Sequence, residues 1–314
     1  MTFLISHQVI SPVYLIVLGF VIGVLGGFFG VGGSFLAAPA LFAAGVPLNF
    51  VVGTDLAHIV GKSIVAAKKH RALGNVDVKL GMIMVVGTIV GVECGAQMIE
   101  ALKRHAHVDS VVGAVYVVVL VLISVFMAWE SWLTIKMRAD RKEAALKRGL
   151  NPDKVASQKD ESALAGISRW VHRINIGPRI NLPESGIPKI SIWPIILVAF
   201  IGGVFSGFLG GGAGYIRMPA MVYLLGIPTH VAVGTDLFEV MISASYGTFT
   251  HALKGNVDIM IALVMHTGAA IGAQIGATTT RYFGGPRIRL AFVPLPLIGA
   301  VAVLYNLLSG KHTS

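Results

Sequence analysis

The sequence has little charge and a single cysteine, and both shortages narrow the classes of protein that it can encode. Only 13% of the 314 residues are charged, whereas soluble domains have about 25%. The one cysteine, Cys94, excludes a disulfide within the chain and any zinc site built from cysteines. The N-terminus lacks the basic segment and cleavage site of a removable signal peptide, so we expect the first apolar segment to be retained.

Apolar residues, in contrast, are abundant. They make up 55% of the chain, and the mean hydropathy is +0.78. Apolar runs of roughly 18 residues or more are long enough to cross a bilayer as helices. We therefore expect an all-α integral membrane protein with eight long transmembrane helices, at Pro12–Phe29, Phe50–Val65, Val78–Ile99, Val108–Ile135, Ile192–Leu209, His230–Phe249, Val257–Thr280 and Ile288–Leu308.

Much of the sequence occurs twice. Each copy contains a glycine-rich segment, a proline, Val-Gly-Thr-Asp-Leu, a histidine and Gly-Asn-Val-Asp, in the same order. A duplicated apolar unit is typical of transporters whose binding site lies between the two halves. The sequence thus predicts a first transmembrane repeat at residues 1–135, a connector at 136–190 and a second, homologous repeat at 191–314.

Each copy also contains a segment too short to span the bilayer. Ser34–Ala44 and Tyr215–Leu225 both follow glycines and contain a proline. At 1.5 Å per residue, each would cross only about half of the membrane. The glycine-rich backbone before them must face protein or a water-filled cavity. We therefore predict two discontinuous half-helices.

Basic residues gather in the connector. Residues 136–190 contain twelve Lys or Arg and six Asp or Glu, which is a large part of the net charge of +10. The positive-inside rule produces such a loop on the cytoplasmic side, so the charge does not indicate a nucleic-acid partner. If the half-helices reverse the chain, the other basic loops fall on the same side, which favours inverted over parallel repeats.

The glycine-rich breaks are the first candidates for a binding site. A helix that begins at such a break presents unpaired N–H groups and a partial positive charge to an anion. Small residues also serve close helix packing in membranes, which is the alternative. The glycines predicted to bind substrate are Gly30, Gly32, Gly33, Gly211, Gly212 and Gly214.

Ionisable residues within spans are costly and often functional. Asp55, His58 and Lys62 share one helical face, while the second copy offers Asp236 and Glu239 there. The Thr-Asp pairs act as N-caps or line a cavity, and the cations bind an anion or snorkel to an interface. The predicted substrate-binding side chains are Thr54, Lys62, Arg217 and Thr235; those predicted for proton coupling or gating are Asp55, His58, Glu93, Asp236 and Glu239; His266 is a further ionisable residue within a span.

These motifs together resemble the TauE/SafE family of sulfite and sulfonate exporters. The resemblance covers both halves and leaves out the connector. It implies a secondary transporter of the bacterial inner membrane that moves a sulfur-containing anion such as sulfite, a sulfonate or thiosulfate, driven by protons. Many members carry serine where this chain has Asp55 and Asp236. The motif positions are Gly30, Gly32, Gly33, Pro39, Gly53, Thr54 and Asp55, then Gly210, Gly211, Gly212, Gly214, Pro219, Gly234, Thr235 and Asp236.

Alternating access between the two repeats is the expected mechanism, with no enzymatic activity, metal or cofactor. The expected partners are the bilayer and a small anion, and a homodimer is left open. Two alternatives remain. A cation or metal transporter would use Asp55, His58, Asp236 and Glu239. A membrane receptor or enzyme would need an asymmetric catalytic cluster or a soluble domain, and the connector supplies neither.

Overall fold

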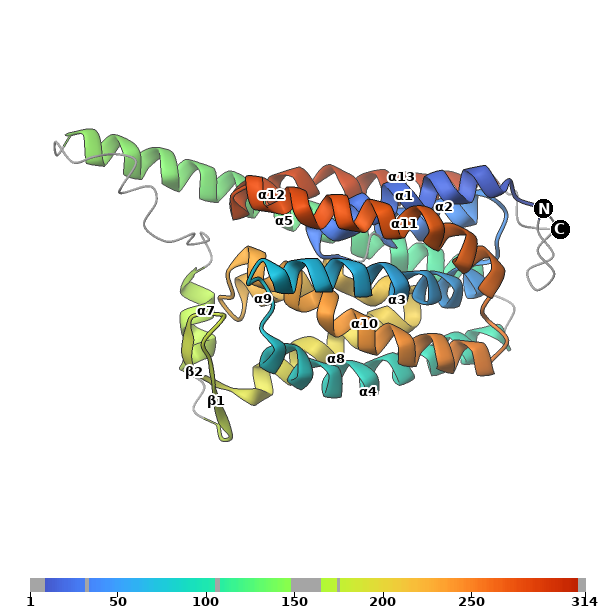
Figure 1. The fold of residues 1–314 in the computed structure, drawn as a ribbon, viewed down its shortest axis with the longest axis horizontal. Coiled ribbons are helices and arrows are strands. Elements are labelled where there is room, and N and C mark those ends of the chain that lie inside the picture. The colour runs from blue at the N-terminus through green and yellow to red at the C-terminus, as the bar shows by residue number, and fades with distance from the viewer. Residues whose placement is uncertain (1–8, 32–33, 105–107, 148–164, 174–175, 310–314) are drawn as a thin grey trace.

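The computed structural model describes residues 9–31, 34–104, 108–147, 165–173 and 176–309, and its helices form one bundle (Figure 1). The first half contains α1 (Pro12–Phe29), α2 (Ser34–Ala43), α3 (Leu48–Ala72), α4 (Val78–Lys103) and α5 (Val108–Lys147). The second half contains α8 (Ile192–Leu209), the 3₁₀ turn η1 (Gly211–Ala213), α9 (Gly214–Tyr223), α10 (Thr229–Leu253), α11 (Ile259–Thr279), η2 (Thr280–Tyr282), α12 (Gly285–Phe292) and α13 (Pro294–Leu308). Between them lie α7 (Ala165–His172), β1 (Arg179–Leu182) and β2 (Ile187–Ser191).

In the part of the chain that the structure describes, seven helical segments are long and apolar enough to cross a membrane. The prediction of a helical membrane protein is confirmed, and seven of the eight expected spans are among these segments. The segment expected at His230–Phe249 forms α10, which has 25 residues but is not apolar enough to be counted. The segment expected at Ile288–Leu308 is one of the seven, at Arg287–Leu308, and is divided into α12 and α13 where Pro294 begins a new helix.

The two half-helices form as predicted. Helices α2 and α9 have ten residues each, so each is about 15 Å long. Gly30, Gly210 and Gly212 have φ values of 74°, 81° and 70° at the breaks that precede them, a left-handed region that favours glycine. A Cβ atom at Gly214 would collide with the backbone of Val31, so the two breaks touch each other in the bundle.

Each tight helix pair joins the two halves. Helix α1 lies along α11, and α4 lies along α8. Any side chain at Gly23 would collide with the backbone of Ala269, and one at Gly91 would collide with the backbone of Phe200. Small residues allow such close approach, and in membranes it is packing rather than the hydrophobic effect that holds helices together.

The contacts also fix the directions of the helices. His70, near the end of α3, bonds to the carbonyl oxygen of Gly27, near the end of α1, so α1 and α3 run in the same direction. Helix α4 returns antiparallel to α3 and runs parallel to α8 (Figure 1). Helix α8 therefore runs opposite to its counterpart α1, which is the direction expected of inverted repeats.

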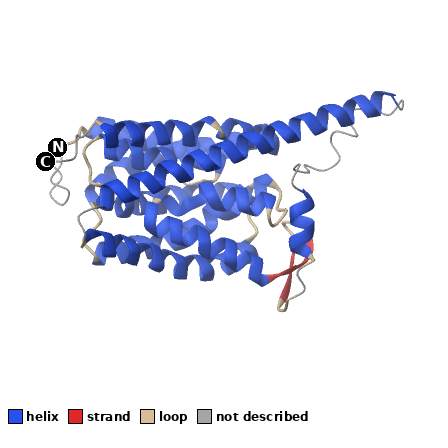
Figure 2. Ribbon diagram, turned by 180° about the vertical axis from the view of Figure 1, so that it is seen from behind, coloured by secondary structure: helices blue, strands red, loops and turns tan. Residues whose placement is uncertain are grey.

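Helix α7 and the strands β1 and β2 of the connector lie at one end of the bundle (Figure 2). Strands β1 and β2 form an antiparallel hairpin. The Nε2 atom of His172 on α7 lies 2.9 Å from the carbonyl oxygen of Leu225, which follows α9. Ser185, between the two strands, donates to Oδ2 of Asp77 at 2.7 Å. The connector thus touches the end of the second half-helix and the start of α4.

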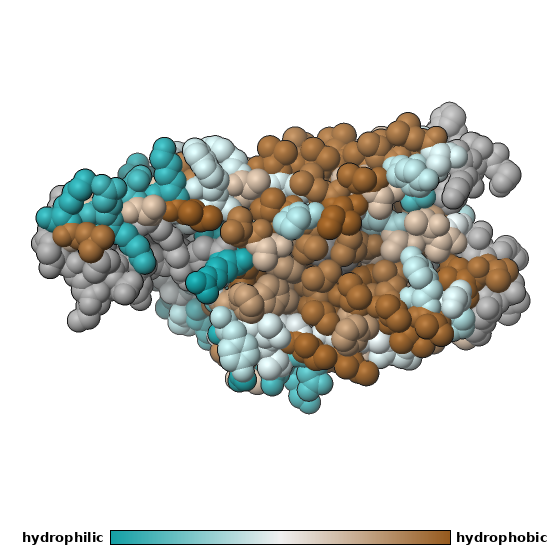
Figure 3. Space-filling model, turned by 90° about the horizontal axis from the view of Figure 1, so that it is seen from above, coloured by the Kyte–Doolittle hydropathy of each residue, from teal (hydrophilic) through white to brown (hydrophobic). Residues whose placement is uncertain are grey.

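Apolar side chains cover the middle of the bundle surface, while hydrophilic ones gather where α5 projects beyond it (Figure 3). The four tryptophans of the chain, Trp129, Trp132, Trp170 and Trp193, belong to α5, α7 and α8 and are between 50% and 65% exposed. Tryptophan is enriched at membrane–water interfaces. We therefore expect the membrane boundary on the connector side to lie near these residues.

Candidate functional site

A group of buried ionisable side chains lies where α3, α9 and α10 meet. Burial of charge inside a membrane protein is costly and is tolerated where groups pair or serve a pathway. Every member of the group is at most 1% exposed. The group consists of Asp55, His58 and Lys62 on α3, Arg217 on α9, and Asp236 and Glu239 on α10.

Arg217 is held by two carboxylates. Its Nε donates to Oδ1 of Asp236 at 2.8 Å, and its Nη1 lies 2.7 Å from Oε2 of Glu239. Among the described residues, its Nη2 has no hydrogen-bond partner. With all three groups ionised, this trio carries one net negative charge. Arg217 does not snorkel to an interface, so that interpretation is wrong for this residue.

Asp55, His58 and Lys62 form a line along α3. The Nδ1 atom of His58 lies 3.5 Å from Oδ1 of Asp55 and 3.5 Å from Nζ of Lys62. Both carboxylate oxygens of Asp55 and the Nε2 atom of His58 lack a hydrogen-bond partner in the described part of the chain. Lys62 is buried as well, so it too stays inside the bundle rather than snorkelling.

Tyr215, on the first turn of α9, stands between the two sets. It is fully buried and interacts electrostatically with both Asp55 and Arg217. The ring of Tyr116 on α5 lies 6.5 Å from it, centroid to centroid. The two halves differ in the position of their buried cation, because Arg217 stands where the first copy has Ala37. The cation comes from the half-helix in one half and from α3 itself, as Lys62, in the other.

The glycine breaks lie against this group as far as they are described. A Cβ atom at Gly214 would collide with Oδ2 of Asp236, so that carboxylate faces the N-terminus of α9. Gly30 packs against the backbone of α10, and Gly212 against Val240. Gly211 belongs to η1. Gly32 and Gly33, also predicted to bind substrate, lie outside the described residues.

Thr54 and Thr235 lie inside α3 and α10 rather than at the N-termini of these helices. Helices α3 and α10 begin six residues before them, so the N-cap interpretation of the Thr-Asp pairs is wrong. The Oγ1 atom of Thr54 accepts the backbone N–H of Asp258, and that of Thr235 accepts the N–H of Asp77, each at 2.9 Å. These paired bonds fasten each half to the first turn of a helix in the other half.

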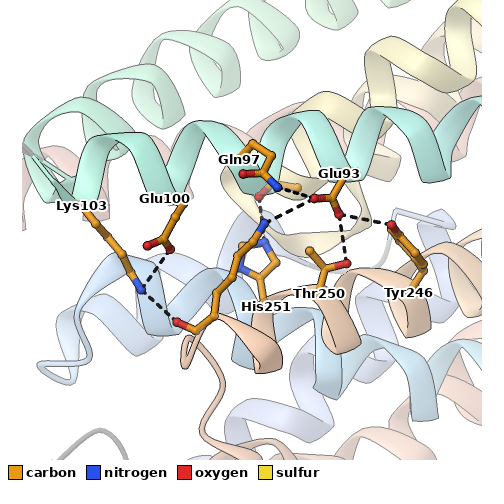
Figure 4. A network of polar contacts seen from close by, with 9 residues as sticks. Glu93, Gln97, Glu100, Lys103, Tyr246, Thr250 and His251 are labelled. Carbon is orange, nitrogen blue, oxygen red and sulfur yellow. Dashed lines mark hydrogen bonds and ion pairs between the residues drawn. The ribbon is translucent and has the colours of Figure 1, made fainter.

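Glu93 lies apart from the buried group, on the side of α4 that faces Tyr246 and Thr250 of α10 (Figure 4). Its side chain is 36% exposed. Its carboxylate accepts from Gln97 at 2.6 Å, Tyr246 at 3.2 Å and Thr250 at 3.3 Å, and lies 3.6 Å from Nζ of Lys254. The structure thus separates this predicted coupling residue from the others and places it in a network that joins α4 to α10.

Sequence reasoning missed a second buried ion pair. Oε2 of Glu130 on α5 lies 3.6 Å from Nε of Arg289 on α12 and accepts from the hydroxyl of Tyr223 at 2.8 Å. Arg289 also donates to Thr229 at 3.1 Å. This cluster fastens the end of α9 to α5 and α12. The feature of the sequence that could have indicated this pair is Glu130, an acidic residue within the span predicted at Val108–Ile135.

Among the described residues, no three His, Cys, Asp or Glu side chains are grouped so that they could hold a metal ion. Apolar spans, two half-helices whose breaks meet, and charged groups buried beside those breaks define a membrane transporter. Residues 15–303 match the model of the family described as "Sulfite exporter TauE/SafE", and the chain belongs to that family. The resemblance stated from the motifs is confirmed, and the family is one of permeases rather than enzymes.

Curated relatives extend over most of the chain. The "Probable membrane transporter protein YunE" of Bacillus subtilis is 26% identical over 279 residues, or 86% of this chain and 89% of that protein. The "Probable membrane transporter protein YjnA" of the same organism is 23% identical over 295 residues, or 93% and 99%. The "Probable membrane transporter protein MJ0441" of Methanocaldococcus jannaschii is 27% identical over 64% of this chain and 74% of that protein. No solved structure matches the chain.

Proposed function

We propose that this protein is a secondary transporter that carries a small sulfur oxyanion across the cell membrane by alternating access, coupled to protons. The observation that carries the proposal is the fully buried Arg217, on the first turn of a half-helix and beside a glycine break. The family description supplies the chemical class of the substrate. A guanidinium group and a helix N-terminus are both suited to an oxyanion.

The two carboxylates on Arg217 give a physical reason for coupling. An anion at the unpartnered Nη2 of Arg217 weakens the attraction of the same guanidinium group for Asp236 and Glu239. A carboxylate displaced into a buried site remains there at high cost unless it takes up a proton. Substrate binding and proton uptake therefore go together, and one proton for each anionic charge leaves the charge of the site unchanged.

The half-helices support alternating access. Their breaks touch at Val31 and Gly214, and each half-helix is about half as long as a span. In transporters with inverted repeats, the site lies near the midplane and movement of one part against another opens it to either side in turn. The basic connector at 136–190 lies on the cytoplasmic side in this proposal, because the positive-inside rule requires it there.

Reconstituted vesicles would test the proposal. The purified protein is placed in proteoliposomes, and uptake of labelled sulfite, thiosulfate and sulfoacetate is measured with and without a pH gradient. We expect gradient-driven uptake of at least one of these anions. Arg217→Met removes the guanidinium and is expected to abolish uptake, whereas Arg287→Met, at an exposed position, keeps it.

Two outcomes would contradict the proposal. Uptake by Arg217→Met at the wild-type rate would remove Arg217 from the site. Uptake of a divalent cation, together with indifference to all three anions, would favour the cation transporter that uses Asp55, His58, Asp236 and Glu239 instead.

A further inference from the structure

The Nδ1 atom of His58 lies between two charged groups, and it cannot donate to one and accept from the other in the same protonation state. The Nδ1 atom of His58 is 3.5 Å from the carboxylate of Asp55 and 3.5 Å from the ammonium of Lys62. Without a proton, Nδ1 is an acceptor and suits Lys62. With a proton, it is a donor and suits Asp55. His58 therefore has two protonation arrangements, each of which satisfies a different neighbour.

His266 extends this line toward the outside of the bundle. It belongs to α11, is partly exposed, and interacts electrostatically with both Lys62 and His58. A Cβ atom at Gly61 would collide with its imidazole ring, so the ring rests directly on the backbone of α3. Its Nδ1 atom is buried and has no hydrogen-bond partner among the described residues.

We propose that His266, Lys62, His58 and Asp55 form a proton relay that is distinct from the anion site at Arg217. The proposal rests on the proposed function and divides it between the two sets of buried charges. Lys62 then carries protons rather than substrate. The first copy of the repeat, which lacks the arginine, then conducts protons toward the anion site, and the second copy binds the anion at Arg217.

Each transfer in the relay moves one proton and leaves the next residue ready. Lys62 gives an N–H proton to Nδ1 of neutral His58, which becomes a cation while Lys62 becomes neutral. The imidazolium then gives that proton to Oδ1 of Asp55, which becomes a neutral carboxylic acid. Lys62 regains its proton from the imidazolium form of His266, which takes its own from water. The sum is one proton moved from water to Asp55.

Charged and polar groups from four helices surround the relay. Asp55 and Lys62 face His58 from α3 itself, and His266 faces it from α11. Tyr215 on α9 and Tyr116 on α5 interact with Asp55. Because Tyr215 also interacts with Arg217, it links the inner end of the relay to the anion site, where α10 contributes the two carboxylates of the trio.

The test compares two transport assays on each variant. Net accumulation driven by a pH gradient requires proton movement, whereas exchange of labelled for unlabelled substrate at equal pH does not. His58→Gln and His266→Gln are expected to lower gradient-driven accumulation by about 100-fold, the scale of a lost proton donor. Exchange is expected to stay at the wild-type rate. His230→Gln, at a surface histidine on α10, serves as the control for loss of an imidazole.

A conservative change at Lys62 separates proton transfer from charge. Lys62→Arg keeps the positive charge, but a guanidinium does not release its proton in proteins. We expect it to lose gradient-driven accumulation while exchange persists. A purely electrostatic role for Lys62 would leave both assays intact in this variant.

The inference is overturned if His58→Gln and His266→Gln retain gradient-driven accumulation, or if both assays fall by the same factor in a folded variant. The second result would indicate a structural role. Failure of the proposed function looks different, because the wild-type protein would then transport none of the three anions in either assay, and the relay would lose its basis.

Discussion

Replacement of Arg217 by methionine tests whether the buried carboxylates of Asp236 and Glu239 depend on the arginine for stability. The substitution keeps much of the side-chain volume but leaves Asp236 and Glu239 close together and without their cation. Removal of one partner from a buried ion pair costs about 3–5 kcal/mol. At about 2 °C per kcal/mol for a chain of this size, the midpoint of thermal unfolding would fall by about 6–10 °C.

A triple variant isolates the cause of this loss. When Asp236→Asn and Glu239→Gln are added to Arg217→Met, no charge remains at the site, and replacement of a complete buried ion pair by neutral groups is often close to neutral in stability. We therefore expect the triple variant to unfold at a higher temperature than the single one, and to transport no substrate. Unfolding in detergent at one fixed heating rate gives the comparison.

The order of the three midpoints decides whether this reasoning holds. A single variant as stable as the wild type would mean that the carboxylates do not depend on Arg217. A triple variant less stable than the single one would mean that the loss comes from packing around the side chain rather than from unpaired charge.

Three further predictions follow from contacts described above. Gly91→Ala forces a methyl group into the backbone of α8 and should cost about 1–3 kcal/mol, measured by thermal unfolding, while Gly166→Ala, with no atom near it, should cost nothing. Thr54→Val removes the acceptor for the N–H of Asp258 and should cost about 1 kcal/mol in the same assay; an unchanged midpoint would show that the bond contributes nothing. Glu93→Gln should leave the KM and rate of transport unchanged, and a loss of coupling in this variant would return Glu93 to the pathway.

Local features of the fold were predictable because they depend on nearby residues. The glycines before Ser34 and Gly214, the prolines and the short apolar runs were enough to predict both half-helices. The pairing of α1 with α11 was not predictable in this way. A stripe of small residues such as Gly19 and Gly23 indicates close packing but does not identify the helix that fills it.

In the candidate site, too, contacts within one helix were predictable from the sequence and contacts between helices were not. Asp55, His58 and Lys62 share a helical face by their spacing, and the structure brings them within 3.5 Å of one atom. The ion pairs of Arg217 join two helices, so no spacing within one helix could predict them. The bond of Thr54 could not be predicted for the same reason, because its partner Asp258 lies 204 residues away.

The exchange of helices between the halves has a consequence for biogenesis. Helix α1 leaves the ribosome first, yet its tight partner α11 begins only at Ile259. At roughly 5–20 residues per second, the wait is about 10–50 s. During that time the glycine stripe of α1 faces lipid or a temporary neighbour. Neither half can complete its packing alone, because the tight partners of α1 and α4 both lie in the other half.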